Sequence, residues 1–119
     1  MYSFNEKRKH QRVNVSSPLR YKEFYGNDLS TRGSLTKNLS KGGVRFNCDK
    51  FVPLSCHLTI EINLNKLSKP VKAVSKVAWI KKLPAGDNYE IGSEFLAVTK
   101  EDNAMISNYM DAAYDEAVI

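Results

Sequence analysis

The sequence predicts an all-β fold, a small barrel, followed by one C-terminal helix. Between Val13 and Val98 the chain has short runs rich in Val, Ile, Leu, Phe and Tyr, separated by polar clusters containing Gly, Asn, Asp, Ser or Pro. From Thr99 onward the apolar residues change to a helical period. The chain has 119 residues, 42% hydrophobic and 26% charged, which is enough for one domain with its own core.

Six strand regions follow from the alternation of apolar and polar residues. We expect strands at 13–15 with 19–25, 31–38, 43–47, 56–64, 70–83 and 88–97. Within 56–64 the apolar side chains should share one core-facing side: Leu58, Ile60, Ile62 and Leu64. The region 70–83 is long enough to need a bend or bulge somewhere near Ser75, and 84–88 has the composition of a hairpin loop. Antiparallel strands of this length hide their edges best in a closed or nearly closed barrel.

The C-terminal segment 99–119 is predicted to be an amphipathic helix. Thr99 followed by Asp102 has the form of a capping box, with a shorter acid than the usual Glu. The apolar stripe recurs at helical spacing: Ile106, Tyr109, Met110, Ala113 and Ala117. Such a stripe can pack on the mouth of its own barrel, which we favour, or on a partner protein.

Charge is distributed unevenly along the chain. Residues 1–50 contain eleven Lys and Arg against four Asp and Glu, a net +7, and residues 51–98 contain six against four, a net +2. Residues 99–119 contain one against five, a net −4, so the whole chain carries +5. Positive charge concentrated in one region favours a local anionic ligand over a long polyanion.

The cysteines and the N-terminus indicate the compartment. Cys48 and Cys56 are too far apart for a C-x-x-C pair, and the two histidines are too few to complete a zinc site, so we expect reduced thiols and no metal. No run of about 18 apolar residues predicts a membrane span, and the N-terminal stretch is charged where a secretory signal would be apolar. We therefore expect a cytoplasmic protein.

The sequence does not carry the common catalytic motifs. It has no G-x-S-x-G, no H-E-x-x-H and no Walker loop. Of the two histidines, His10 lies in a basic run and His57 on the polar side of a predicted strand, and neither has a neighbouring catalytic partner in sequence. We expect no enzymatic activity and no cofactor.

The first motif of interest is a pair of arginines just before the predicted barrel. Arg8 and Arg12 stand four residues apart in a basic stretch. A guanidinium group can hold a phosphate with two parallel hydrogen bonds, stack on a nucleobase, or donate to N7 and O6 of guanine. The alternative is a solvated basic tail, since basic N-terminal arms are common.

The second motif is Asn38-Leu39-Ser40-Lys41-Gly42-Gly43, between two predicted strands. We expect a tight connection from Leu39 to Gly43, in which a glycine takes a positive φ or allows a close backbone approach. Asn38 and Ser40 should emerge on the same side and present an amide and a hydroxyl together, with glycine N–H groups beside them. The same residues are also typical of an ordinary hairpin turn.

Together the two motifs resemble those of the PilZ domain, the receptor module for the bacterial second messenger cyclic di-GMP. That family is marked by R-x-x-x-R near the N-terminus and by (D/N)-x-S-x-x-G some 20 to 30 residues later, and both are complete here. The resemblance continues through Lys76-Val77-Ala78-Trp79 and Ile91-Gly92-Ser93-Glu94-Phe95 and covers the chain from Glu6 to about Val98. It implies a six-stranded antiparallel PilZ-type β-barrel that binds cyclic di-GMP.

The resemblance also implies roles for the motif residues. Arg8 and Arg12 would bind phosphates and guanine Hoogsteen edges, Asn38 a guanine, and Ser40 a phosphate or its neighbouring guanine. The backbone of Gly42 and Gly43 would let the ligand lie close. Many members have Asp in place of Asn38, and an amide cannot supply the negative charge that pairs with the guanine N–H donors.

Lys7 precedes the first arginine of the motif. In the family, an arginine there tends to accompany an intercalated pair of cyclic di-GMP molecules and an apolar residue a single molecule. Lys7 supplies the charge without the stacking plane, which favours the pair weakly.

We expect three parts in the chain, with different tasks. These are a basic arm at 1–12 carrying R-x-x-x-R, a barrel at 13–98 and the helix at 99–119. The arm would close over cyclic di-GMP, and the changed surface would signal to a downstream effector protein.

Two other functions are consistent with the sequence. The first is a PilZ-like interaction module that needs no nucleotide and docks on a partner through the helix stripe. The second is a small barrel that binds single-stranded nucleic acid through aromatic residues near Arg20 and Lys22, namely Tyr21, Phe24 and Tyr25. Nucleic acid is the less favoured partner, because strand aromatics more often lie in the core.

Overall fold

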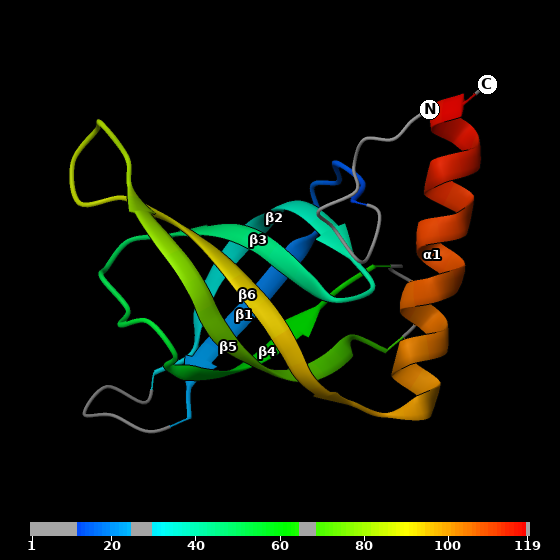
Figure 1. Cartoon of the computed structure of the whole chain (residues 1–119), viewed down its shortest axis with the longest axis horizontal. Helices are drawn as coiled ribbons and strands as arrows, with labels where there is room; N and C mark the ends of the chain where they lie inside the picture. The colour runs from blue at the N-terminus through cyan, green and yellow to red at the C-terminus, as the bar shows by residue number, and fades with distance from the viewer. Residues whose placement is uncertain (1–11, 25–29, 65–68, 119) are drawn as a thin grey trace.

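The computed structural model shows six antiparallel strands that close into a barrel, with one helix beside it (Figure 1). It describes residues 12–24, 30–64 and 69–118. Around the barrel the strands follow the order β1-β2-β3-β6-β5-β4, and the helix comes last in the chain. Their bounds are β1 Pro18–Glu23, β2 Arg32–Ser40, β3 Gly43–Cys48, β4 His57–Ile62, β5 Val71–Lys82, β6 Tyr89–Val98 and α1 Lys100–Val118. The predicted fold, a closed barrel with a C-terminal helix, is confirmed.

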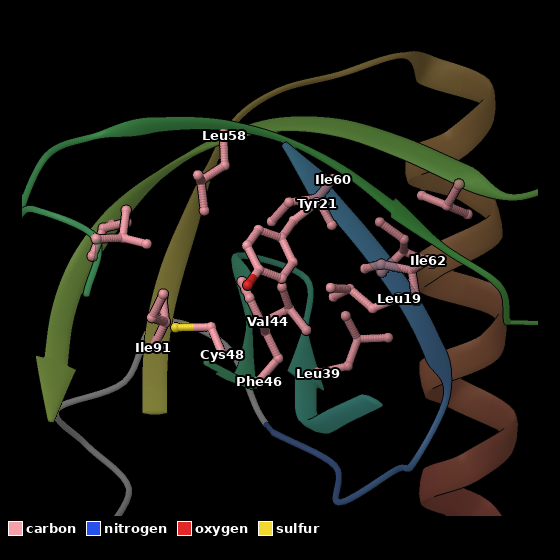
Figure 2. Close-up of a cluster of buried hydrophobic side chains, with 14 of the residues drawn as sticks. Leu19, Tyr21, Leu39, Val44, Phe46, Cys48, Leu58, Ile60, Ile62 and Ile91 are labelled. Carbon is pink, nitrogen blue, oxygen red and sulfur yellow. The ribbon is translucent and has the colours of Figure 1, made fainter. Parts of the chain in front are cut away.

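The barrel interior is filled by the alternating apolar residues. Leu58, Ile60 and Ile62 are fully buried, as their alternation along β4 predicts, and Leu64 packs against them from beyond the strand end. At the centre of this cluster the ring of Tyr21 lies 5.0 Å from that of Phe46 (Figure 2). Aromatic and branched side chains that interlock in this way fix the strand register, because a one-residue slip would turn them outward.

Strand boundaries differ from the predictions mainly at the N-terminal end. The stretch 13–15 is not a strand, since only Val13 forms an isolated bridge, to Leu39, and the first strand begins at Pro18. It ends at Glu23, and residue 25 of the predicted strand lies outside the described residues. The second strand runs on past residue 38 to Ser40, so the connection to β3 is only two residues long.

The long strand β5 contains a bulge, at Ala78, since Val77 pairs with Ser93 and Trp79 with Gly92. The register shift near Ser75 has its extra residue, Leu96, on the neighbouring strand β6. The hairpin loop between β5 and β6 contains Gly86 with a φ of 60°, a conformation that glycine adopts without steric cost. This loop projects from the barrel on the side away from α1 (Figure 1).

Helix α1 is capped and packed by its own chain. The Thr99 hydroxyl accepts the Asp102 backbone N–H at 3.1 Å, as the capping box predicts. The Asp102 carboxylate does not complete the box; it accepts the backbone N–H of Lys72 at 3.1 Å and so ties the helix to β5. Ile106 and Met110 are buried in the main core, so this part of the stripe faces the barrel and not a partner.

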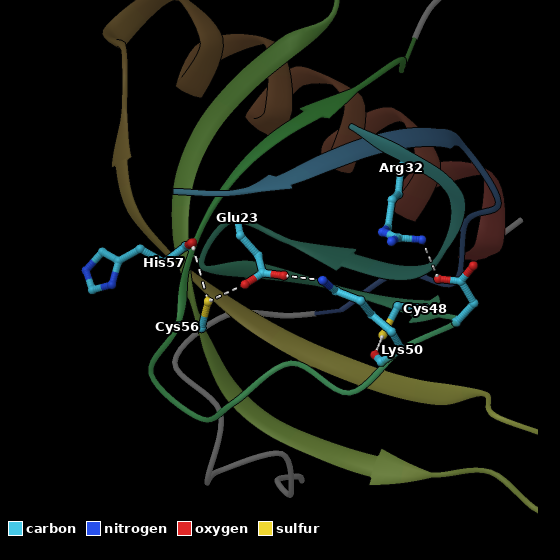
Figure 3. A network of polar contacts seen from close by, with 7 residues as sticks. Glu23, Arg32, Cys48, Lys50, Cys56 and His57 are labelled. Carbon is cyan, nitrogen blue, oxygen red and sulfur yellow. Dashed lines mark hydrogen bonds and ion pairs between the residues drawn. The ribbon is translucent and has the colours of Figure 1, made fainter. Parts of the chain in front are cut away.

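Both cysteines are free thiols in a cluster near the end of β1 (Figure 3). Glu23 lies between Cys56 and Lys50, with Lys50 Nζ 2.6 Å from one carboxylate oxygen and Cys56 Sγ 3.8 Å from the other. Burial is the main cause that raises the pKa of Cys56, and the nearby Glu23 charge adds to it. Burial also raises the pKa of Cys48, whose Sγ contacts the Lys50 carbonyl. Both shifts favour the protonated thiol over the reactive thiolate.

Candidate ligand-binding site

The segment that precedes β1 lies against β2 and brings Arg12 of the first motif to the second motif. Val13 and Leu39 exchange two backbone hydrogen bonds, each 2.9 Å long. Leu39 points into the core, and neighbouring residues alternate between faces. Arg12 therefore lies on the outer face of the barrel, the same face that presents Asn38 and Ser40.

Arg12 contacts the second motif directly. Its Nη1 donates a hydrogen bond to Asn38 Oδ1 at 3.2 Å, although the two residues are 26 positions apart in sequence. Asn38 is 5% exposed, so this residue is largely shielded from water. A guanidinium group has five N–H donors, so it can keep an amide contact and still hold a phosphate or a guanine edge.

A bulge in β2 sets which residues face outward. Thr36 pairs with Phe46 and Leu39 pairs with Val44, so both lie on the core side although they are three positions apart in sequence. Regular alternation cannot place them on one side, and the register indeed shifts between Thr36 and Asn38. The extra residue turns Asn38 to the outer face. We did not predict this bulge from the sequence.

Thr36 anchors the segment that carries Arg12. Its hydroxyl accepts the backbone N–H of Ser17 at 2.8 Å and donates to the carbonyl of Val15 at 2.7 Å. The Thr36 backbone N–H also donates to the Ser17 carbonyl. This side chain thus satisfies two backbone groups of a segment without regular structure. Sequence reasoning missed it, because a Thr inside a strand is an ordinary strand residue.

Replacing Thr36 with Val should loosen this segment. The change keeps the shape of the side chain but leaves the Ser17 N–H and the Val15 carbonyl without their partner, which costs about 1–3 kcal/mol at a buried site. Urea unfolding measures this loss. The matched control is Thr59→Val, whose exposed hydroxyl makes only a 3.4 Å contact with the Lys22 carbonyl. Equal stability of the two variants would contradict an anchoring role for Thr36.

The hydroxyl of Ser40 closes the turn between β2 and β3. Its Oγ accepts the backbone N–H groups of Gly42 and Gly43, each at 3.1 Å. The turn is also held from the side, because Phe95 of β6 donates its N–H to the Gly42 carbonyl at 2.9 Å. In this structure the hydroxyl and the glycine N–H groups are thus hydrogen-bonded to one another.

Gly43 allows the close backbone approach that the sequence predicts, and it does so toward β6. A Cβ at this position would overlap the backbone carbonyl oxygen of Ser93. Among the glycines that the structure describes, Gly86 is the one with a positive φ. Gly42 and Gly43 therefore do not adopt the positive φ that was the other expectation for this turn. The motif glycine therefore has a packing role in the barrel itself.

Arg45 places a further positive charge beside the motif. It is the strand partner of Asn38, and its Nε lies 3.1 Å from Glu90 Oε2. The Glu90 side chain is 13% exposed, so the ion pair is partly shielded from water. Within the described part of the chain, the Arg45 Nε–H has no hydrogen-bond acceptor of suitable geometry. Sequence analysis did not single out this residue.

Some of the predicted residues lie beyond the described ranges or have other surroundings. Lys7, Arg8 and His10 are outside the described residues. The His57 ring nitrogen Nδ1 lies 3.1 Å from the carbonyl of Ser55 on an exposed part of the chain. Among described residues, no group of three or more His, Cys, Asp and Glu is placed to hold a metal ion.

Of the aromatic residues proposed for nucleic-acid stacking, the structure describes Tyr21 and Phe24. Tyr21 is 3% exposed and belongs to the core, so its ring cannot stack on a base. Phe24 is 44% exposed, and Tyr25 lies outside the described residues. The helix found in the described ranges is not apolar enough to cross a membrane.

Comparison with solved structures identifies the same barrel in other proteins. The chain superimposes on the PilZ domain of Escherichia coli YcgR, solved with cyclic di-GMP, with a TM-score of 0.71 and 17% identity over 93% of this chain and 94% of that domain. It also superimposes on the Bacillus subtilis inhibitor of motility MotI, with a TM-score of 0.73 and 16% identity over 94% of this chain. The chain spans about half of MotI, 51% of its length.

A more distant match is the PilZ domain of CeSA from a cellulose-synthesizing bacterium, with a TM-score of 0.59 and 10% identity over 90% of this chain and 98% of that domain. A search of curated proteins gave no significant match. The family model of the PilZ domain matches residues 6–112, which is nearly the whole chain and includes both sequence motifs. The chain belongs to the PilZ domain family.

Proposed function

We propose that this chain is a receptor for cyclic di-GMP that signals to a partner protein. The observation that carries the proposal is the hydrogen bond between Arg12 and Asn38, because it links one residue of R-x-x-x-R with one residue of N-x-S-x-x-G. The fold shared with the YcgR domain that was solved with cyclic di-GMP supports it. No catalytic step is part of the proposal.

Each motif residue has a chemical task in this proposal. Arg8 and Arg12 bind the ligand through charge-assisted hydrogen bonds to phosphate oxygens and to the Hoogsteen edges of guanine. Asn38 hydrogen-bonds a guanine, and Ser40 a phosphate or the neighbouring guanine. For the glycine N–H groups to contact the ligand as well, the Ser40 hydroxyl has to release one of the two that it now accepts.

The signal arises from the arm. The contacts of Val13 with Leu39 and of Arg12 with Asn38 already fix the base of the arm on the barrel. Binding of the nucleotide then adds charge-assisted contacts that exist only when the rest of the arm closes, so the ligand shifts the population toward the closed form. The receptor of a bacterial second messenger would work in the cytoplasm, where the partner reads the closed surface.

Calorimetric titration of the purified chain with cyclic di-GMP tests the proposal. We expect saturable binding, and the stoichiometry distinguishes one bound molecule from the intercalated pair that Lys7 favours weakly. The Arg8→Ala variant should lose about 10 to 150-fold in affinity, since a charged bidentate contact contributes about 1.5–3 kcal/mol. If the unaltered chain shows no heat of binding at millimolar ligand, the proposed function is wrong.

The two other functions receive less support. An interaction module that docks through its helix stripe would need that stripe exposed, but Ile106 and Met110 are buried against the barrel. A binder of single-stranded nucleic acid would need exposed aromatic rings along a positive groove, and Tyr21 is buried.

A further inference from the structure

A second concave surface lies on the outer face of β1, β4, β5 and β6. It is a groove of about 740 Å³ whose lining comes mainly from these four strands. One row of residues crosses it from strand to strand, since Lys22 pairs with Thr59, Thr59 with Val74, and Val74 with Ala97. The groove is built from different strands from those that carry Asn38 and Ser40, so it is separate from these two motif residues.

The floor of the groove is apolar and exposed. Val74, Ala97 and Leu96 contribute to it, and Leu96 is 47% exposed. Leu96 is the extra residue of the β6 bulge, since Ala97 pairs with Val74 and Phe95 with Ser75. A bulge re-aims a side chain out of the regular alternation, and here it directs a large apolar side chain to the surface. An exposed apolar floor with polar surroundings is typical of a site that binds another molecule.

The surroundings of this floor are positively charged. Arg20, Lys22 and Lys72 line the groove and are exposed, and Glu61 is the one acidic residue of the lining. Among the described residues these three cations form no ion pair. In contrast, Arg45 and Lys76 are paired with Glu90 and Glu94. The three charges are therefore available to carboxylates that arrive from outside.

The groove is connected to the nucleotide site through the chain itself. The segment 12–17, which carries Arg12 and is anchored by Thr36, continues directly into β1, whose Arg20 and Lys22 form one wall of the groove. Arg12 and two of the three cations therefore lie on one continuous stretch of chain. A receptor with its ligand on one face and a docking surface on another can report the ligand without sharing atoms with it.

We propose that this groove is the docking site for an acidic segment of a partner protein that carries a large apolar side chain. The apolar side chain packs on Leu96 and Val74, and the carboxylates pair with Arg20, Lys22 and Lys72. A flat membrane surface fits less well, because the apolar floor is concave and recessed between charged residues. The role of the groove as an output surface rests on the proposed receptor function, whereas the docking itself does not.

Selection from a random peptide library displayed on phage tests the docking. The bait is the whole chain, with and without cyclic di-GMP. We expect the enriched peptides to be acidic and to share a Leu, Ile, Phe or Trp, and a synthetic copy of one should bind with an affinity that falls as salt is added. Failure to enrich any family, or enrichment of basic or neutral peptides, would overturn the proposal.

Two variants locate the binding of the synthetic peptide. Leu96→Asp and Lys22→Glu should each weaken it at least tenfold, because one removes the apolar contact and the other repels the acid. The matched controls are Leu54→Asp, which changes another exposed leucine, and Lys81→Glu, on an exposed part of β5 outside the groove; both should bind like the unaltered chain. Equal binding by all four variants would place the peptide elsewhere and overturn the proposal.

Two further measurements separate the alternatives. Arg12→Ala should bind the peptide as the unaltered chain does and bind cyclic di-GMP much more weakly. Failure of the nucleotide proposal and failure of the groove proposal therefore give different results. Vesicles of phosphatidylcholine with phosphatidylglycerol should not bind better than phosphatidylcholine alone. If the unaltered chain binds the anionic vesicles and Leu96→Asp and Lys22→Glu abolish this binding, the groove is assigned to a membrane surface. That result would overturn the peptide assignment.

Discussion

Replacing Arg12 with Ala should weaken cyclic di-GMP binding by about 10 to 150-fold. Arg12 is the arginine of the first motif that lies against the second, through its hydrogen bond to Asn38. In the proposed complex the same guanidinium holds the ligand by a charge-assisted bidentate contact, which contributes about 1.5–3 kcal/mol. Arg12→Lys keeps the charge but not the planar guanidinium fork. The affinity of this variant should therefore lie between those of the unaltered chain and Arg12→Ala. Calorimetric titration of the three proteins measures the series.

The matched control is Arg20→Ala. It lowers the net charge by the same amount, but Arg20 lies on β1, opposite Glu61 of β4, away from the motif residues. Its affinity for cyclic di-GMP should stay within about threefold of the unaltered chain, a difference below 1 kcal/mol. If Arg12→Ala and Arg20→Ala bind equally well, only the general positive field matters and the specific role of Arg12 is wrong.

Replacing Gly43 with Ala should destabilise the barrel by about 2–3 kcal/mol and lower Tm by on the order of 10 °C. The added Cβ would overlap the backbone carbonyl oxygen of Ser93 on the neighbouring strand β6. A backbone oxygen cannot rotate away as a side chain can, so the strands β3 and β6 must move apart. Thermal unfolding followed by circular dichroism measures the change, in the absence of any nucleotide.

Gly33→Ala is the control for this substitution. Gly33 is also in a strand, β2, and a Cβ there would meet no atom within 4 Å. Because glycine in a strand loses more conformational freedom on folding than alanine does, this variant should be as stable as the unaltered chain or slightly more stable. A Gly43→Ala protein as stable as Gly33→Ala would show that the motif glycine has no packing role in the barrel.

The regular parts of the fold could be predicted because local patterns specify them. Alternation along β4 identified Leu58, Ile60 and Ile62 as core, and the threonine before the acidic turn marked the start of α1. The length of β5 predicted an irregularity within the strand, and β5 has a bulge at Ala78. In each case neighbouring residues in sequence contain the information, since burial of one strand face or capping of one helix end needs no distant partner.

The arrangement of the candidate site depends on contacts between residues far apart in sequence. Nothing near Val13 indicates that it pairs with Leu39, and the Thr36 hydroxyl gives no sign that it will anchor a segment about twenty residues earlier. The bulge that turns Asn38 outward follows from the need of both Thr36 and Leu39 to face the core. Such features require the register of whole strands, which alternation alone does not determine.

Ser40 and Gly43 are two further residues whose contacts could not be predicted from the sequence motif. The residue types of a ligand-binding turn and of an ordinary hairpin are the same, so the motif could not reveal that the Ser40 hydroxyl closes its own turn. Nor could it reveal that the space beside Gly43 is filled by Ser93 of a strand about fifty residues later. The resemblance to the PilZ family predicted the ligand, whereas the residue types alone predicted only a turn.

A crystal structure of the chain with cyclic di-GMP tests most directly whether Arg12 and Asn38 belong to one nucleotide site. We expect a phosphate or guanine of the ligand within hydrogen-bond distance of the Arg12 guanidinium, and a guanine at the Asn38 amide. A ligand bound elsewhere on the barrel, with the Arg12 to Asn38 hydrogen bond unchanged and no nucleotide atom near either side chain, would contradict this assignment.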